Sequence, residues 1–383
     1  MHVAFMSVPA AGHVHPGLGL VQELRGRGHR VSYATTGEFA DRVRAAGADP
    51  LVYRASSGYG GRVVRLLSVM EMFLDETVHA LPQVADAYAA ERPDVIVYDS
   101  AAHHAPILAE RWQIPAVAIN PTIIPLSSSD LFGSTPDPDA VAFLERYSRF
   151  LAAQGVERDL ESLLFRPHRS IVTVPRSFMP DPDLYGDEFT FVGSLSTESD
   201  TDVEWSAEED RPVLLITLGS VYNDDLEFYR QCLAAFGHTD WRVIMAVGDQ
   251  LDPATLGEVP PNFEVRHWVP QASVLDRASA FVTHAGMGGT MEGLVRGVPL
   301  IAVPQAVDQL VTGPKIAELG VGCHIPREAV TVGSLRAALA EVTAPAFVAR
   351  VKEMQRDILA LGGASSAADV VEEEFRRAHG ART

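Results

Sequence analysis

Short apolar runs alternate with longer amphipathic stretches along the first half of the chain. The runs have the length of buried strands and lie at residues 3–8, 30–35, 50–53, 94–98 and 116–120. Between them, apolar residues recur at helical spacing, which predicts helices at 17–26, 39–46, 66–91 and 105–112. Buried strands separated by helices are typical of a parallel sheet covered on both faces. The pattern therefore predicts an α/β fold with a doubly wound parallel sheet.

A polar, acidic segment at 194–211 interrupts this alternation and has the composition of an interdomain linker. After it, apolar runs resume at 213–218, 242–247, 263–266, 280–283 and 300–303. The 383 residues fit two domains of about 190 residues each. We therefore predict an N-terminal domain at 1–200 and a C-terminal domain at 201–362, two Rossmann-like halves that face a central cleft. A last helix within 363–383 is expected to pack back on the first domain.

The most distinctive polar segment, FVTHAGMGGTME at 281–292, joins a predicted strand to a predicted helix. Its glycines would let an anion approach backbone N–H groups at the positive end of a helix dipole. His284 could add a donor to a diphosphate, and Glu292 could accept hydrogen bonds from a ribose. A tight turn in which His284 only caps the strand explains the same pattern, since glycine-rich turns of this kind are common.

Two polar residues follow predicted strands of the first domain. His13 stands in a loop, flanked by glycine and proline, directly after the first strand. The ordinary pKa of histidine suits a general base near neutral pH. Asp99 ends the strand at 94–98 and could orient a histidine ring, as an aspartate does in a catalytic triad. Capping roles remain open for both, and His103 and His104 are expected to line the cleft or face solvent.

The loops of the second domain carry groups suited to a nucleotide. Gly219 and Ser220 follow a strand and could approach it closely. Trp268 and Gln271 place an aromatic face beside an amide, which suits a uracil-like ring. Without Gln271 and the downstream loop, Trp268 would equally be a residue that fills the core.

Sugar and acceptor sites are suggested by further side chains. Adjacent carboxylate and amide groups at 308–309 suit the hydroxyls of a hexose. Methionine and aromatic side chains within 56–73 and 122–150 suit a bulky apolar acceptor. The acceptor candidates are Tyr59, Met70, Phe73 and Phe132. Most of these side chains are individually explained as well by a place in the core.

The charge balance narrows the choice of ligands and partners. The net charge of −19 argues against nucleic acid or an anionic membrane as the main partner. An anionic ligand must therefore be held by local dipoles and placed donors. Neither a signal peptide nor an apolar run of transmembrane length is recognised, so we expect a cytoplasmic protein without stable membrane insertion.

Taken together, three motifs resemble the donor-binding signature of the family 1 glycosyltransferases. They are HWVPQ (267–271), HAGMGGTME (284–292) and PQAVDQ (304–309), in matching order and spacing. The resemblance covers essentially the whole chain. The segment at 12–35, GHVHPGLGLVQELRGRGHRVSYAT, is especially similar to the bacterial macrolide glycosyltransferases.

The resemblance implies the GT-B fold, a nucleotide-sugar donor and no metal or other cofactor. His13 would be the general base and Asp99 its partner. Uracil, ribose, diphosphate and sugar would be bound by Gly219, Ser220, Trp268, Val269, Gln271, His284, Gly286, Gly289, Thr290, Glu292, Asp308 and Gln309. Plant members carry Trp-Asn-Ser where this chain has residues 287–289, which leaves the finer donor preference open.

The implied reaction is an inverting transfer of a hexose, with UDP-glucose as first choice, to a hydroxyl of a bulky apolar natural product such as a macrolide. A dTDP-deoxysugar donor is the alternative. An NAD(P)-dependent oxidoreductase is the rival from another class. It is disfavoured because no G-x-G-x-x-G follows the first strand and no acidic residue ends the second. A monomer and a homodimer both remain open.

Overall fold

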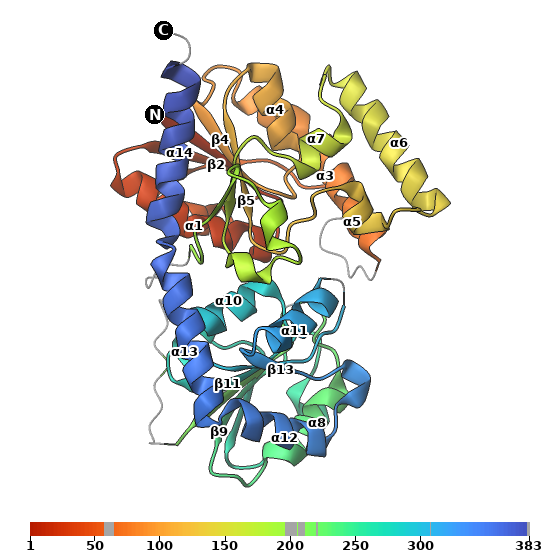
Figure 1. Ribbon diagram of the computed structural model, residues 1–383, viewed down its shortest axis with the longest axis vertical. Coiled ribbons are helices and arrows are strands. Elements are labelled where there is room, and N and C mark those ends of the chain that lie inside the picture. The colour runs from red at the N-terminus through yellow and green to blue at the C-terminus, as the bar shows by residue number, and fades with distance from the viewer. Residues whose placement is uncertain (57–64, 196–204, 206–210, 220, 307, 381–383) are drawn as a thin grey trace. The chain divides into compact units, whose positions relative to one another are not determined.

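The computed structural model describes the chain except for residues 57–64, 196–204, 206–210, 220, 307 and 381–383. The chain divides into two compact units, each built on one β-sheet (Figure 1). Unit 1 comprises Met1–Thr197 and Leu361–Thr383, and unit 2 comprises Glu198–Ala360. Both sheets are parallel and carry helices between their strands, so the predicted α/β class with two Rossmann-like sheets is confirmed.

The sheet of unit 1 has seven strands in the order β3-β2-β1-β4-β5-β6-β7. Its strands are β1 (His2–Met6), β2 (Arg30–Thr35), β3 (Asp49–Val52), β4 (Val95–Asp99), β5 (Ala116–Asn120), β6 (Ser170–Val172) and β7 (Phe189–Phe191). Its α-helices are α1 (Ala11–Gly26), α2 (Ala40–Ala45), α3 (Leu66–Ala87), α4 (His104–Trp112), α5 (Ser128–Phe132), α6 (Pro138–Ala153), α7 (Leu160–Phe165) and α14 (Gly363–Gly380). Short 3₁₀ turns lie at Arg176–Phe178 and Pro182–Leu184.

The core of unit 1 lies on both faces of this sheet. Alternate residues of a strand point to opposite faces, so β1 contributes Ala4 and Met6 to one apolar cluster and Val3 and Phe5 to another. The first cluster includes residues of α3 and α4, and the second includes residues of α1 and α14. Burial on both faces explains why β1 and β4 read as continuous apolar runs.

The sheet of unit 2 has six strands in the order β10-β9-β8-β11-β12-β13. Its strands are β8 (Val213–Thr217), β9 (Arg242–Ala246), β10 (Phe263–Arg266), β11 (Ala278–Thr283), β12 (Leu300–Ala302) and β13 (Gly322–His324). Its α-helices are α8 (Leu226–Phe236), α9 (Gln271–Leu275), α10 (Met287–Val295), α11 (Gln309–Glu318), α12 (Val332–Val342) and α13 (Pro345–Ala360). Short 3₁₀ turns lie at Pro253–Leu256 and Arg327–Ala329.

Each sheet has one topological switch point, where neighbouring strands continue in opposite directions along the sheet. In unit 1 it lies between β1 and β4, and in unit 2 between β8 and β11. Ligands of doubly wound proteins bind beyond the carboxyl ends of the strands at such points. The strand order therefore singles out the loops after these four strands.

The predicted start of the first helix, at Gly17, is wrong. Helix α1 begins at Ala11, so His13 lies in its first turn and not in a loop. Glycine at position 12 and proline at position 16 both disfavour a helix, which makes this turn read as irregular. Pro16 removes one backbone hydrogen bond, but the turn persists because Val14 is fully buried and anchors it to the core.

Helix α14 returns to unit 1, and Figure 1 shows it in blue beside α1. It contacts α1, β4 and β5, and Arg27, the residue directly after α1, forms an ion pair with Asp369 at 2.6 Å. Among the described helices, none by itself has the length and apolar character to cross a membrane, although Val332–Val342 taken with Pro345–Gly380 passes on those two criteria.

Candidate active site

The switch point of unit 1 brings together a histidine and an aspartate that are far apart in the chain. Nδ1 of His13 lies 2.9 Å from Oδ1 of Asp99. Asp99 is 5% exposed, whereas the His13 side chain is 30% exposed. The same Oδ1 accepts the backbone N–H of Ala101 at 2.9 Å. Capping of α4 by Asp99 is therefore wrong, since that helix begins at His104 and the carboxylate shapes the turn before it.

This pair has the geometry of a general base and its orienting carboxylate. An ionised carboxylate only accepts hydrogen bonds, so Nδ1 of His13 carries the proton. The lone pair of the imidazole then lies on Nε2, the atom that can take a proton from a hydroxyl. A charged carboxylate also stabilises the imidazolium that this transfer forms.

Aromatic side chains of unit 1 lie next to the pair of His13 and Asp99. The ring of Phe73 meets the rings of His13 and His103 edge-on, with centroids 5.8 Å and 6.1 Å away. His103 and His104 are 4% and 0% exposed, so of the two predicted positions, lining the cleft or facing solvent, the second is wrong. Burial lowers the pKa of each to about 4, and both are neutral at neutral pH.

The acceptor candidates are placed differently from one another. Met70 is buried in the core of unit 1, while Phe73 and Phe132 are partly buried against it. Phe132 packs edge-on against Phe143 at 6.1 Å. Tyr59 lies outside the described residues. The ring of Phe73 contacts the ring of His13.

The switch point of unit 2 is built from two strands that end alike. Thr217 of β8 and Thr283 of β11 are paired neighbours. The Oγ1 of each accepts the backbone N–H two residues on, from Gly219 at 3.1 Å and from Ala285 at 3.3 Å. These threonines were not among the predicted site residues, although a threonine followed two residues later by a glycine or alanine ends both strands. Such side-chain-to-backbone bonds fix the start of a turn.

The ring of His284 occupies space that two glycines leave open. A Cβ added to Gly219 would lie 2.6 Å from Cε1 of the ring, and one added to Gly286 would lie 2.3 Å from Nε2. Gly219 also has a φ of +78°, which favours glycine. Nδ1 of His284 is buried and has no hydrogen-bond partner among the described residues. Burial lowers the pKa of His284 to about 4, so the ring is neutral at neutral pH.

Helix α10 presents its first turn after a strained residue. Ala285 has a φ of +64°, an uncommon conformation that is enriched at functional sites. Gly286 is the N-cap and provides no side-chain cap for the N–H groups of the first turn. An added Cβ would meet nothing within 4 Å at Gly288 and only ordinary contacts at Gly289. Close packing therefore requires glycine at position 286 but not at position 288 or 289. The space beside these two glycines leaves room for a ligand.

The residues expected to hold the nucleoside lie close to this turn. Nε2 of Gln271 donates to Oε2 of Glu292 at 2.7 Å, so the proposed base and ribose contacts are joined. Trp268 is 67% exposed, and its interpretation as a residue that fills the core is wrong. The next residue, Val269, is buried and anchors the loop that carries the indole.

The other donor candidates differ in how exposed they are. Asp308 is exposed. Gln309 is 6% exposed, and its Oε1 accepts the N–H groups of Gln305 at 2.9 Å and Ala306 at 3.2 Å. The side-chain carbonyl of Gln309 thus holds the backbone of the loop that precedes it. Thr290 is fully buried, with no partner for Oγ1 among the described side chains and backbone groups, and Ser220 lies outside the described residues.

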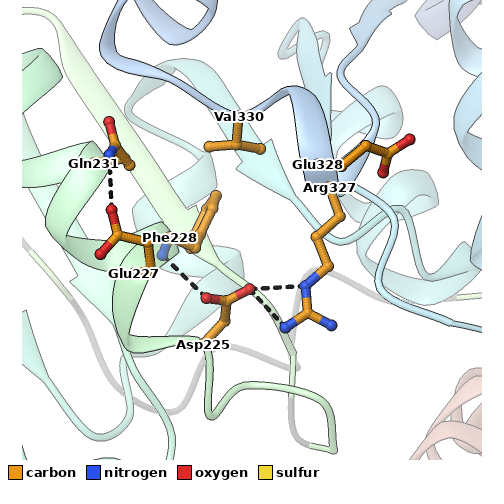
Figure 2. A pocket seen from close by; sticks show the side chains of 7 residues that line it. All are labelled: Asp225, Glu227, Phe228, Gln231, Arg327, Glu328 and Val330. Carbon is orange, nitrogen blue, oxygen red and sulfur yellow. Dashed lines mark hydrogen bonds and ion pairs between the residues drawn. The ribbon is translucent and has the colours of Figure 1, made fainter.

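A separate pocket of roughly 350 Å³ lies beside α8 in unit 2 (Figure 2). Asp225 caps α8 by accepting the N–H of Phe228 at 3.1 Å, and it pairs with Arg327 at 2.9 Å. Gln231 donates to Glu227 at 2.8 Å. Figure 2 shows these groups directed at one another, so their contacts tie α8 to the turn after β13. The pocket lining includes none of the described donor candidates.

Comparison with known proteins agrees with this geometry. Residues 230–373 match the family model described as Erythromycin biosynthesis protein CIII-like, C-terminal domain. Oleandomycin glycosyltransferase of Streptomyces antibioticus is 36% identical over 397 aligned positions, which cover 99% of this chain and 92% of that protein. An NDP-glycosyltransferase of Bacillus subtilis is 36% identical over 385 positions, covering 97% and 96%. The solved structure of the glycotransferase of kitacinnamycin matches with a TM-score of 0.89 at 37% identity, over 97% of this chain and 98% of that one.

These matches extend over both units, and so over the His13–Asp99 pair of unit 1 and the candidate donor residues of unit 2. They leave the oxidoreductase alternative without support. The high coverage of these matches and their identities of 36% and 37% support the resemblance that the three motifs indicate. The chain therefore belongs to the family 1 glycosyltransferases, which have the GT-B fold.

Proposed function

We propose that the protein is an inverting, metal-independent glycosyltransferase that moves a hexose from a nucleotide sugar to a hydroxyl of a bulky apolar natural product. UDP-glucose is the first choice of donor, and a macrolide is the first choice of acceptor. The observation that carries the proposal is the contact of 2.9 Å between His13 and Asp99. The relative that is named as an oleandomycin glycosyltransferase supports the choice of acceptor.

In the proposed reaction, Nε2 of His13 removes the proton of the acceptor hydroxyl. The acceptor oxygen forms a bond to the anomeric carbon while the bond from that carbon to the diphosphate oxygen breaks. Attack from the face opposite the nucleotide inverts the anomeric centre, so an α-linked donor gives a β-glycoside. Asp99 stabilises the imidazolium throughout.

The leaving diphosphate carries the negative charge that develops in this step. We assign its stabilisation to the N-terminus of α10, whose first-turn N–H groups point at one spot and lack a side-chain cap. His284 contributes a further donor to the same diphosphate. Trp268 would stack on the base, and Gln271 and Glu292 would bind its edge and the ribose.

The choice of donor sugar rests on Asp308, because a carboxylate pairs well with the hydroxyls of glucose. A dTDP-deoxysugar lacks some of these hydroxyls and would use the carboxylate less. This second donor remains the alternative, since Gln309 is partly committed to its own loop.

Binding and turnover test the proposal directly. UDP and dTDP should each be titrated while the melting temperature of the protein is followed. Products from a panel of hydroxyl-bearing acceptors with each donor should then be identified by mass spectrometry, with and without EDTA. We expect stabilisation by UDP and an EDTA-insensitive gain of one hexose. Absence of stabilisation by both nucleotides would overturn the proposal.

Donor affinity should rise as the pH falls, because a bound diphosphate favours the protonated form of His284. The ring is neutral in the free protein, its pKa being lowered to about 4 by burial. If binding raises this pKa, protons are taken up on binding, and affinity increases toward low pH. We expect UDP-glucose to bind about threefold to tenfold more tightly at pH 5.5 than at pH 8. Calorimetry should measure this, and a His284→Gln variant should show no such slope.

Substitution of Gly289 should separate stability from binding. Alanine fits the protein at this position, and alanine in a helix is favoured over glycine by roughly 0.5–1 kcal/mol. The added methyl group would lie 3.7 Å from Nε2 of Gln271, a proposed donor contact, and would leave less space for a nucleotide bound beside this turn. We expect Gly289→Ala to raise the melting temperature while the Kd for UDP-glucose rises on the order of tenfold. A more stable variant with unchanged affinity would show that the anion does not approach Gly289.

A further inference from the structure

A buried amide in unit 2 is placed where it can join the loops of the donor site. Asn223 lies between β8 and α8, and its side chain is 1% exposed. Its Nδ2 donates to the backbone carbonyl of Gly219 at 2.8 Å. Gly219 is the residue against which the ring of His284 packs. The amide therefore holds the peptide that supports the histidine.

The loop after β9 leaves space for this amide. Gly248 has a φ of +72°, which favours glycine. A Cβ at Gly248 would lie 2.0 Å from Nδ2 and 2.4 Å from Cγ of Asn223. Those distances are far below contact, so a larger residue at position 248 would expel the asparagine from its place. Gly248 is thus required both by its backbone conformation and by the neighbouring side chain.

Gly248 is bonded in turn to the loop after β10. Its N–H donates to the carbonyl of His267 at 3.0 Å, and its carbonyl accepts from Nδ1 of His267 at 2.8 Å. His267 directly precedes Trp268, the exposed indole. Because β8, β9 and β10 are adjacent in the sheet, these contacts connect three successive loops at one edge.

We propose that Asn223 is a positioning residue of the donor site, which holds the diphosphate loop at Gly219 and the base-stacking loop at Trp268 in a fixed relation. A nucleoside diphosphate is recognised at both ends, so a site in which the two loops are already aligned loses less freedom on binding. The inference rests on the donor site assigned under the proposed function.

Two substitutions at position 223 test this role. Asn223→Ala removes the donor to Gly219, and Asn223→Asp keeps the shape but turns a carboxylate toward a carbonyl oxygen. We expect both to raise the Kd for UDP and the KM for the donor on the order of tenfold, with a smaller change in kcat. The matched control is Gln250→Ala, since Gln250 is exposed and donates to Val221 of the same loop at 3.1 Å. This control should leave the Kd within about twofold.

A double-mutant cycle tests the link to Gly248. Gly248→Ala alone must displace Asn223, so it should weaken UDP binding about as much as Asn223→Ala does. In the combined variant the side-chain clash is absent and only the backbone strain of alanine at a φ of +72° remains, so the loss of affinity should be smaller than the sum of the two single losses. Additive losses of affinity would overturn the link between the two residues.

Hydrogen exchange in the ligand-free protein gives a readout that needs no nucleotide. In Asn223→Ala we expect faster exchange at the N–H of Gly219 and also at the N–H of Gly248, which is bonded to His267. Unchanged exchange at Gly248 would overturn the inference while leaving the proposed function intact. Failure of the unaltered protein to bind UDP and dTDP would instead overturn the proposed function, and exchange would still decide whether Asn223 joins the loops.

Discussion

Replacement of His13 by alanine should reduce glycosyl transfer to alcohol acceptors by about 10²–10⁴-fold, the range for loss of a general base. The reason is that nothing then removes the hydroxyl proton as the acceptor oxygen attacks. Nucleotide affinity should stay nearly unchanged, because the donor contacts are all assigned to the other unit. Steady-state kinetics with UDP-glucose, together with calorimetric titration of UDP, measures both quantities.

A histidine on the same helix provides the control. His15 lies near Phe39 and is bonded to Arg42, and burial lowers its pKa to about 4. His15→Ala should leave transfer within a few-fold of the unaltered enzyme. Asp99→Asn should fall between the two, since the ring loses its charged partner but keeps its place. Full activity in His13→Ala would remove His13 as the base.

Gly286→Ala should cut kcat/KM for the donor on the order of a hundredfold, the effect expected when a binding group is displaced by about 1 Å. The φ of Gly286 is −62°, so alanine is tolerated by the backbone. Its Cβ would nevertheless lie 2.3 Å from Nε2 of His284, and the ring must move. The measurement is the Kd for UDP-glucose with kcat/KM, each compared with His284→Ala.

The matched control is a glycine in the first turn of α12. A Cβ at Gly333 would meet only Thr331 Oγ1, at the ordinary distance of 3.8 Å. Gly333→Ala should therefore preserve the donor affinity and kcat/KM. Should Gly286→Ala bind the donor as well as Gly333→Ala does, the ring of His284 would have no part in the site.

Fold class and the positions of the candidate site residues along the chain could be predicted because both depend on local pattern. Buried parallel strands leave continuous apolar runs, and the donor motifs stand directly after such runs. The start of α1 could not be predicted, because burial of Val14 outweighs the helix-breaking tendencies of its neighbours. The exposure of these side chains could not be predicted from local pattern either. Trp268 is exposed, whereas His103 and His104 are enclosed by helices and aromatic rings that are distant in sequence.

The sequence alone determined which side chains follow which apolar runs: His13 after the run at 3–8, Asp99 after that at 94–98 and His284 after that at 280–283. Only the tertiary structure decided which of these ends are neighbours. Hydrogen bonding places β1 beside β4 and β8 beside β11, although long segments separate them in the chain. The tertiary structure also decided at which positions packing requires a glycine. Packing gives Gly219, Gly248 and Gly286 a neighbour that excludes any Cβ, and it gives Gly288 none, because the space around a residue is set by the whole fold.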